Sequence, residues 1–234
     1  MVSMKITVIG ASGLIGTKVV DLLTAEGHDV VAASRGSGVD VLTGSGLAEA
    51  LSGADVLVDV VNSPSFEDDP VMEFFKKSTS NLVVVAARAG VGHYAALSIV
   101  GVDGLPDSGY MRAKVVQEKI ITESGLPYTI VRATQFAEFT DAITDSMIDG
   151  DQVRVPDALI QPIAADDVAR DVARAAVAGP LNGIVNIGGP QKISFEQMAR
   201  DTLARRDDDK TVVVDPEAQY FGTKLAERSL VTPD

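Results

Sequence analysis

The sequence predicts an α/β protein built on a doubly wound parallel sheet, with a small C-terminal substrate lobe. Short β-branched runs alternate with longer helical patterns as far as Arg132, and a glycine-rich turn follows the first run. With 234 residues, 46% of them hydrophobic, the chain can bury one sizeable core. We therefore expect a single domain over 1–234, with a core over about 1–134 and a lobe over about 135–234.

Five buried strands are expected in the core, most of them separated by helices: Lys5–Ile9, Val30–Ala33, Val56–Val61, Ala95–Val100 and Tyr128–Arg132. The helical patterns cover about Leu14–Glu26, Leu47–Leu51, Pro70–Ala89 and Gly109–Ser124. Asp69 before Pro70 is typical of a helix start. After Arg132 the rhythm changes, which marks the lobe: helical patterns at Phe136–Met147, Asp166–Val177 and Phe195–Arg205, and a strand at Gln152–Val155.

Composition excludes several kinds of site and partner. A net charge of -13 repels phosphate backbones, so neither nucleic acid nor an anionic membrane is expected as a partner. The absence of cysteine excludes disulfides and thiolate metal sites, and two histidines are too few for a three-histidine site, so no metal is expected. No targeting signal and no apolar run of about 20 residues is present, and we expect a cytoplasmic protein.

A glycine-rich turn, Gly10-Ala11-Ser12-Gly13-Leu14-Ile15-Gly16, directly follows the first predicted strand. Glycines let the chain turn tightly, let backbone N–H groups approach a pyrophosphate, and let the helix pack close to the strand. An ordinary strand-to-helix turn is the alternative, but the position in a βαβ unit favours dinucleotide binding. We expect these residues to contact the cofactor: Gly10, Ser12, Gly13, Leu14, Ile15 and Gly16.

The end of the second strand, Ser34-Arg35, indicates NADP rather than NAD. It offers no carboxylate for a ribose 2′-hydroxyl, whereas a guanidinium can bind a 2′-phosphate with the hydroxyls of Ser34 and Ser12 beside it. A solvated Arg35 on a flexible loop is the alternative. Asn62 and Ser63 follow the third strand, where they either contact the adenosine half or form a plain turn.

Tyr110 and Lys114 form a Tyr-x-x-x-Lys pair, which a helix places about 40° apart on one face. An ammonium beside a phenol lowers the phenol pKa and makes it a usable acid or base. Ser98 precedes this pair near the carboxyl end of its strand, so we expect Ser98, Tyr110 and Lys114 to be catalytic. The alternative is a buried serine, a surface tyrosine and a lysine paired with Glu118. Tyr220 and Lys224 repeat the spacing without a preceding serine, and we interpret them as coincidence.

These motifs, together with Ala96-Leu97-Ser98-Ile99-Val100-Gly101 and Tyr128-Thr-Ile-Val-Arg-Ala-Thr-Gln-Phe136, resemble an atypical short-chain dehydrogenase/reductase of the NmrA-like NAD(P)H-binding group over essentially the whole chain. The resemblance implies a Rossmann fold, with Tyr110 as proton donor, Lys114 on the nicotinamide ribose and Ser98 on the substrate oxygen. It also implies that Ala133, Thr134, Gln135 and Phe136 line the nicotinamide. The long helix offers only Asn81 as a counterpart of the asparagine in the family's proton relay.

The leading hypothesis is an NADPH-dependent carbonyl reductase with Tyr110 as general acid. The alternatives are a non-catalytic NADP(H)-sensing regulator, of a kind found in this group, and a quinone or flavin reductase that depends little on Tyr110. Gln135, Phe136 and Phe139 are predicted to line a substrate pocket whose apolar side chains favour a hydrophobic carbonyl compound. The sequence leaves the substrate and the oligomeric state open, including a dimer through the Tyr110 helix.

Overall fold

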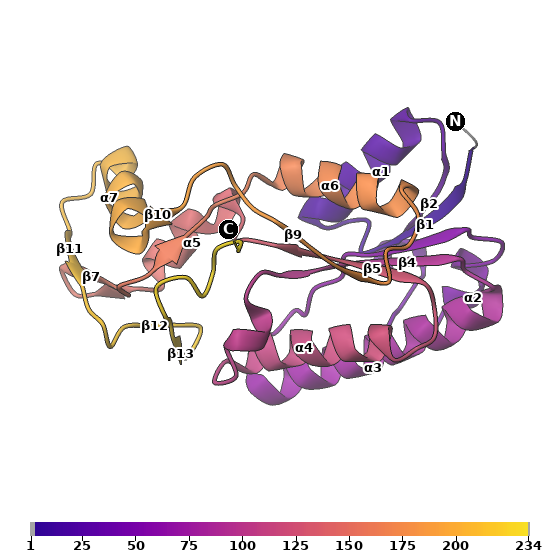
Figure 1. Ribbon diagram of the computed structural model, residues 1–234, viewed down its shortest axis with the longest axis horizontal. Coiled ribbons are helices and arrows are strands. Elements are labelled where there is room, and N and C mark those ends of the chain that lie inside the picture. The colour runs from indigo at the N-terminus through magenta and orange to yellow at the C-terminus, as the bar shows by residue number, and fades with distance from the viewer. Residues whose placement is uncertain (1–2, 234) are drawn as a thin grey trace.

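The computed structural model describes residues 3–233, which form a parallel-sheet core and a C-terminal lobe (Figure 1). All pairings in the central sheet are parallel, in the order β2-β1-β3-β4-β5-β9. The strands are β1 (Lys5–Ile9), β2 (Asp29–Ala33), β3 (Val56–Asp59), β4 (His93–Ile99), β5 (Tyr128–Ala133) and β9 (Gly183–Ile187). The predicted Rossmann-type sheet is confirmed.

Helices cover both faces of this sheet (Figure 1). One face carries α1 (Leu14–Ala25) and α6 (Ala165–Val177), and the other carries α3 (Asp68–Ala89) and α4 (Gly109–Thr122). The short α2 (Leu47–Ala50) precedes β3, and single 3₁₀ turns occur at Arg35–Ser37, Val102–Gly104 and Ala137–Phe139. Both α6 and β9 come from beyond residue 135, so the core includes elements that the sequence assigns to the lobe.

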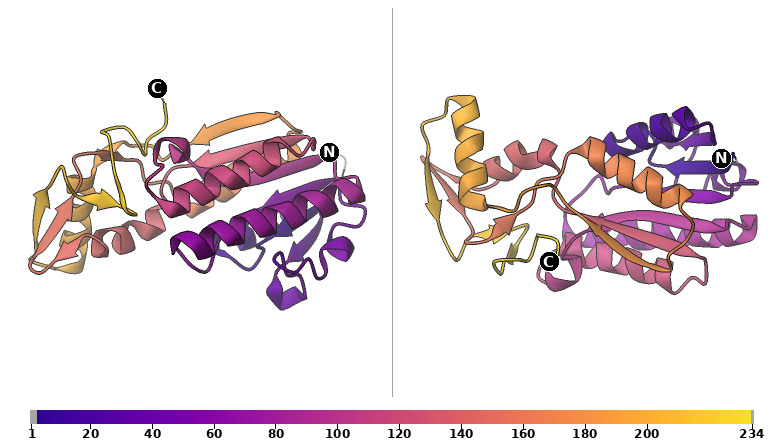
Figure 2. Two further views of the ribbon diagram at one scale, coloured as in Figure 1. Left: turned by 90° about the horizontal axis from the view of Figure 1, so that it is seen from below. Right: turned by 45° about the horizontal axis from the view of Figure 1, so that its top comes forward.

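The lobe is built from short elements at one end of an elongated molecule (Figure 2). Its helices are α5 (Thr140–Asp145) and α7 (Phe195–Arg206). Its strands are β6 (Ile148–Asp149), β7 (Gln152–Val155), β8 (Leu159–Ile160), β10 (Ile193–Ser194), β11 (Thr211–Val214), β12 (Gln219–Tyr220) and β13 (Thr223–Lys224). Leu105 and Met111 from the core share a buried cluster with Phe195 and Leu230, so the lobe packs against the beginning of α4.

The sheet positions the site because all six strands end at the same edge, and ligands of open α/β sheets bind beyond that edge. The glycine loop, the beginning of α4 and the lobe all lie beyond strands that end there. No helix within residues 3–233 is long and apolar enough to span a membrane.

Candidate functional site

The glycine loop is fixed by backbone contacts. The N–H groups of Gly10 and Ala11 both donate to the carbonyl oxygen of Ala33, at 3.0 and 3.1 Å. Gly10 has a φ of +89°, and a Cβ there would lie 3.0 Å from the Val60 backbone. A Cβ at Gly16 would lie 2.1 Å from the Gly10 oxygen, so α1 packs against the loop at a distance that only glycine permits.

The N-terminus of α1 is left open by its N-cap residue, Gly13. No side chain caps it, and its first turn contains no acidic residue. The first N–H groups of a helix have no intrahelical partner and favour an anion. The side chain of Ile15 is buried while Ser12 is exposed, so Ile15 can reach a ligand only through its backbone. The loop therefore fits a pyrophosphate.

Arg35 lies at the carboxyl end of β2, beside the glycine loop. Its side chain is exposed, and it makes no hydrogen bond or ion pair with any other described residue. The Ser37 hydroxyl joins both backbone groups of Ser34 at 2.9 Å, which holds the turn. The next carboxylate, Asp40, accepts from the backbone of Leu42 at 2.7 Å and is committed to its own turn. The arrangement fits a 2′-phosphate better than a 2′-hydroxyl.

Tyr110 lies in the first turn of α4, and its hydroxyl donates to Oδ1 of Asn62 at 2.9 Å. The same oxygen accepts from the N–H of Ser63 at 2.9 Å, so these two residues position the phenol. Burial raises the pKa of Tyr110 to about 12, against the smaller lowering effect of the Asn62 bond. The expected lowering of the Tyr110 pKa by Lys114 is therefore wrong. The ammonium of Lys114 interacts with other groups, and desolvation of the phenol has the larger effect.

Lys114 points into the layer between α4 and the sheet. Its Nζ donates to the carbonyl oxygen of Leu97 at 2.9 Å and to Oε1 of Gln117, and it lies 4.7 Å from the ring centroid of Phe75. Burial lowers the pKa of Lys114 to about 8, although the negative charges of Asp59 and Glu118 oppose this change. An ammonium has three donors, and two are used within the described residues.

Asp59 completes this buried network at the end of β3. Its Oδ2 accepts from Tyr94 at 2.8 Å and from Nε2 of Gln117 at 3.0 Å. Burial raises the pKa of Asp59, while the Lys114 charge and the hydrogen bonds lower it. Asp59 and Gln117 were not predicted from the sequence. A charged residue ending an apolar strand and a glutamine three positions after the lysine were the available signals.

Ser98 lies in β4 but does not donate to the Tyr110 site. Its hydroxyl donates to Oε1 of Glu118 at 2.5 Å. The Glu118 carboxylate also accepts hydrogen bonds from Nε and Nη2 of Arg132, at 2.9 and 2.6 Å. The partner of Glu118 is thus Arg132 rather than Lys114. A hydroxyl has one proton to donate, so Ser98 can donate to a substrate oxygen only by leaving Glu118.

The segment after β5 supplies the other predicted contacts. Both polar groups of Thr134 are used inside the protein: its N–H donates to Ile187 at 3.1 Å and its hydroxyl to Gln161 at 2.5 Å. Gln135 is 8% exposed, and neither polar atom of its amide has a hydrogen-bond partner within the described residues. A buried amide without a partner indicates a missing ligand or water.

Beside Gln135, the rings of Phe136 and Phe139 stack at 5.7 Å, and Phe139 is 49% exposed. Ala133, the last residue of β5, is buried. This segment thus holds one buried amide without a partner within the described residues and, beside it, the exposed ring of Phe139, as expected for a wall of a binding site.

Three other residues considered in the sequence lie elsewhere. His28 directly precedes β2 and His93 begins β4, so both occupy the amino edge of the sheet, away from the glycine loop. The amide of Asn81 donates to the carbonyl oxygens of Val41 and Leu42 at 2.9 and 3.1 Å, which holds the loop after β2 rather than a proton relay.

The second Tyr-x-x-x-Lys pair is not helical. Tyr220 lies in β12 and Lys224 in β13, on opposite strands of a hairpin. Their spacing in sequence therefore places them on no common helical face.

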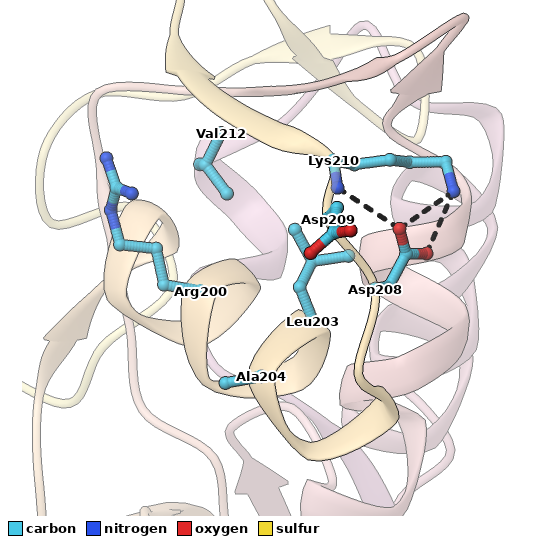
Figure 3. Close-up of a pocket in the computed structure, with 7 residues that line it drawn as sticks. All are labelled: Arg200, Leu203, Ala204, Asp208, Asp209, Lys210 and Val212. Carbon is cyan, nitrogen blue, oxygen red and sulfur yellow. Dashed lines mark hydrogen bonds and ion pairs between the residues drawn. The ribbon is translucent and has the colours of Figure 1, made fainter.

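Two surface cavities lie outside the predicted contacts. A cavity of about 310 Å³ in the lobe is lined in part by Arg200, Asp208 and Lys210 (Figure 3), and Lys210 donates to Asp208 at 2.8 Å. Arg200 pairs with Glu196 outside the cavity, and the cavity contains none of the predicted site residues. A cavity of about 410 Å³ lies over the ends of β4 and β5, with Arg132 in its wall.

Comparisons with known families and proteins identify the kind of domain and its fold. Residues 10–178 match the model of a family described as NAD(P)H-binding. The chain is 28% identical over 147 residues to a photosystem II assembly factor, Ycf39, of Cyanophora paradoxa, and 23% identical over 149 residues to the factor of that name in Synechocystis. The matches cover 57% and 58% of this chain but 46% of each relative, less than half of their length.

Solved structures show the same fold. An NADPH-dependent quinone oxidoreductase of Escherichia coli, complexed with NADPH, has a TM-score of 0.65 and 22% identity, covering 90% of this chain and 77% of that chain. A dTDP-glucose 4,6-dehydratase of Streptomyces venezuelae with NAD bound has a TM-score of 0.74 and 19% identity, covering 96% and 88%. These identities support a shared fold and leave the reaction open.

Proposed function

The chain belongs to the NAD(P)H-binding family, and from this premise we propose that it is an NADPH-dependent reductase that delivers hydride to a carbonyl carbon while Tyr110 supplies the proton. The open N-terminus of α1 would hold the pyrophosphate, and Arg35 the 2′-phosphate. Lys114, with its remaining donor, would hold a ribose hydroxyl. NADPH, when bound, supplies the hydride.

The observation that carries this proposal is the state of Tyr110. Its hydroxyl is a half-buried donor fixed by Asn62, and with a pKa of about 12 it keeps its proton at neutral pH. A positioned acid that is protonated suits reduction, in which the developing alkoxide takes up a proton; like Ser98, Tyr110 has one proton, so its hydroxyl turns from Asn62 to the substrate oxygen in order to donate it.

The segment after β5 supports the substrate side of the proposal. Ala133 and Thr134 would line the nicotinamide, and the unpartnered amide of Gln135 suits an amide or carbonyl group of the bound molecules. Phe136 and Phe139 would cover an apolar part of the substrate. The second donor originally expected, Ser98, enters this reaction only if its bond to Glu118 breaks.

A quinone reductase is the second candidate, because Ser98 is committed to Glu118 and the raised pKa of Tyr110 makes it a weaker acid. Reduction of a quinone needs little help from an acid, since the product oxyanion is stabilised by its own ring. One neighbour with this fold is an NADPH-dependent quinone oxidoreductase.

NADPH oxidation should be followed with ketones, aldehydes and quinones, comparing wild type, Tyr110→Phe and a control, Tyr128→Phe, at the amino end of β5. We expect carbonyl turnover to fall by about 10² to 10⁴ in Tyr110→Phe, the usual contribution of a general acid. The control should be unaffected.

A fall of less than about tenfold would refute the proton-donor role, and quinone turnover that survives the change would favour the second candidate. If calorimetry shows NADPH binding while no substrate is reduced, both candidates fail. Binding without turnover would favour a nucleotide-sensing protein.

A further inference from the structure

The ring of Tyr110 meets the rings of two phenylalanines that come from distant segments. Phe66 comes from the loop before α3, and Phe221 from the turn between β12 and β13, which lies near the beginning of α4 in Figure 1. The centroid of the Tyr110 ring lies 5.3 Å from that of Phe66 and 6.5 Å from that of Phe221, and the two phenylalanines are 6.0 Å apart.

These two phenylalanines are unusually accessible. Phe66 is 55% exposed and Phe221 is 49% exposed, although each has an aromatic neighbour. Behind Tyr110, Phe75 is fully buried and meets it edge-on at 6.0 Å, so the tyrosine has a closed side and an open side. The open side carries the two accessible rings.

The backbone conformation of Phe221 is energetically unfavourable for a phenylalanine. Phe221 and Gly222 form a two-residue hairpin turn with φ values of +48° and +78°. A turn with both φ values positive favours Asn, Asp or Gly, because a bulky side chain is strained in that conformation. Among the described residues, the other non-glycine positions with positive φ are Asn182 and Asp207, which follow this rule.

The hairpin also fixes the direction of the Phe221 ring. Tyr220 is buried and packs edge-on against both Phe195 at 5.8 Å and Phe221 at 4.7 Å. Lys224 on the second strand pairs with Glu217 at 2.5 Å. Phe221 is half exposed, so burial of its side chain contributes little free energy to offset the backbone strain. The ring therefore has a role other than stabilising the turn.

Polar donors lie directly beside these rings. The Tyr110 hydroxyl donates a hydrogen bond to the side-chain oxygen of Asn62. The side-chain NH₂ of Asn62 has no hydrogen-bond partner within the described residues. An apolar wall next to the side-chain N–H donors of Asn62, and to a Tyr110 hydroxyl that can donate once it leaves Asn62, matches a molecule with a flat ring and an attached oxygen acceptor.

We propose that Phe66 and Phe221 bind the flat ring of an aromatic or quinoid carbonyl substrate, with its oxygen toward Tyr110 and Asn62. This inference rests on the proposed function and narrows its substrate to compounds whose carbonyl is attached to or part of a planar ring. Aliphatic carbonyl compounds lack the surface that this wall contacts.

The test replaces Phe221 by Asn, which the turn prefers, and by Tyr, which keeps a ring. Leu181→Asn removes a 63% exposed apolar side chain near the amino edge and serves as the control. Binding of 1,4-naphthoquinone in the presence of NADP⁺ is measured by calorimetry, so that no turnover is needed. Melting temperatures and NADP⁺ affinities are measured for the same proteins.

We expect Phe221→Asn to melt at a higher temperature and to bind naphthoquinone about tenfold more weakly, with NADP⁺ affinity unchanged. Phe221→Tyr and Leu181→Asn should bind the ring like wild type. An Asn variant that loses less than threefold would overturn the proposal, as would an equal loss in the Tyr variant.

Turnover separates this inference from the proposed function. The ratio of kcat/KM for acetophenone to that for butanone should fall in Phe221→Asn and stay constant in Leu181→Asn. Ring binding without any turnover would support the binding role of Phe66 and Phe221 and refute the proposed reductase activity. Turnover by the wild type with no preference for ring substrates would support the reductase activity and refute the binding role of Phe66 and Phe221.

Discussion

The two ends of the candidate site are built in different ways. At the glycine loop the binding groups belong to the backbone of consecutive residues, and side chains would obstruct them. At the Tyr110 end the groups are side chains brought from β3, α4 and the β12–β13 hairpin. The first end is therefore sensitive to added atoms, and the second to removed atoms.

Adding one methyl group at the glycine loop is expected to have the largest effect. In Gly16→Ala the new Cβ would lie 2.1 Å from the Gly10 oxygen, with rigid backbone on both sides. We expect lower melting temperature and loss of measurable NADPH binding, at a cost of about 1–3 kcal/mol or more for the overpacking. Gly13→Ala, whose Cβ would lie 3.3 Å from the same oxygen, should keep the fold. Equal melting temperatures for the two variants would contradict this difference.

Removing the buried charge at the Tyr110 end should affect activity without unfolding the protein. Lys114→Met is combined with Asp59→Asn so that no buried charge is left without its partner; the aliphatic chain is kept, and losing both desolvated charges offsets the lost bonds to Leu97 and Gln117. We expect kcat to fall by about 10² while the melting temperature changes little. Circular dichroism melts and steady-state kinetics on one preparation test this, and a matching fall in stability would show that Lys114 is only structural.

Arg35→Ala should weaken NADPH binding by about 10- to 100-fold, since a hydrogen bond to a charged group contributes about 1.5–3 kcal/mol. NADH has no 2′-phosphate, and its affinity should stay constant. Calorimetric titration with both cofactors measures the selectivity. Arg88→Ala, an exposed arginine at the end of α3, is the matched control. Equal losses for NADH and NADPH would place Arg35 away from the 2′-phosphate.

The smallest expected effect is on the pH profile. Because the pKa of Lys114 is lowered to about 8, the ammonium is lost as pH rises through that value, and kcat/KM should fall with it. The negative charge of Asp59 raises the pKa of Lys114, so Asp59→Asn should move the fall to lower pH. A pH profile of kcat/KM that is identical in wild type and Asp59→Asn would show that the charge of Asp59 does not influence the pKa of Lys114.

The same group links pH to stability. Burial lowers the pKa of Lys114 below its ordinary value of 10.5, so the charged form is disfavoured in the folded state. This cost is fully present below about pH 8 and disappears as pH rises toward 10.5, so the contribution of Lys114 to stability should increase over that interval. Urea melts of wild type and Lys114→Met across this range would isolate it.

Local features of the chain depend only on neighbouring residues and were predictable from them. The strand, glycine turn and helix at 5–25 are local, and so is the position of Tyr110 and Lys114 on one face of α4. Backbone conformation follows from steric limits and hydrophobic periodicity within a few residues, which is why these features could be predicted.

The partners of the buried side chains depend on contacts between segments that are far apart in the sequence. Ser98 bonds to Glu118, Lys114 to Gln117 and Leu97, and Phe221 meets Tyr110 across the interface between core and lobe. β9 joined the core sheet although no strand is predicted there from the sequence, which assigns this segment to the lobe. Such contacts depend on strand register, on desolvation and on how the lobe packs against α4, which no local pattern contains.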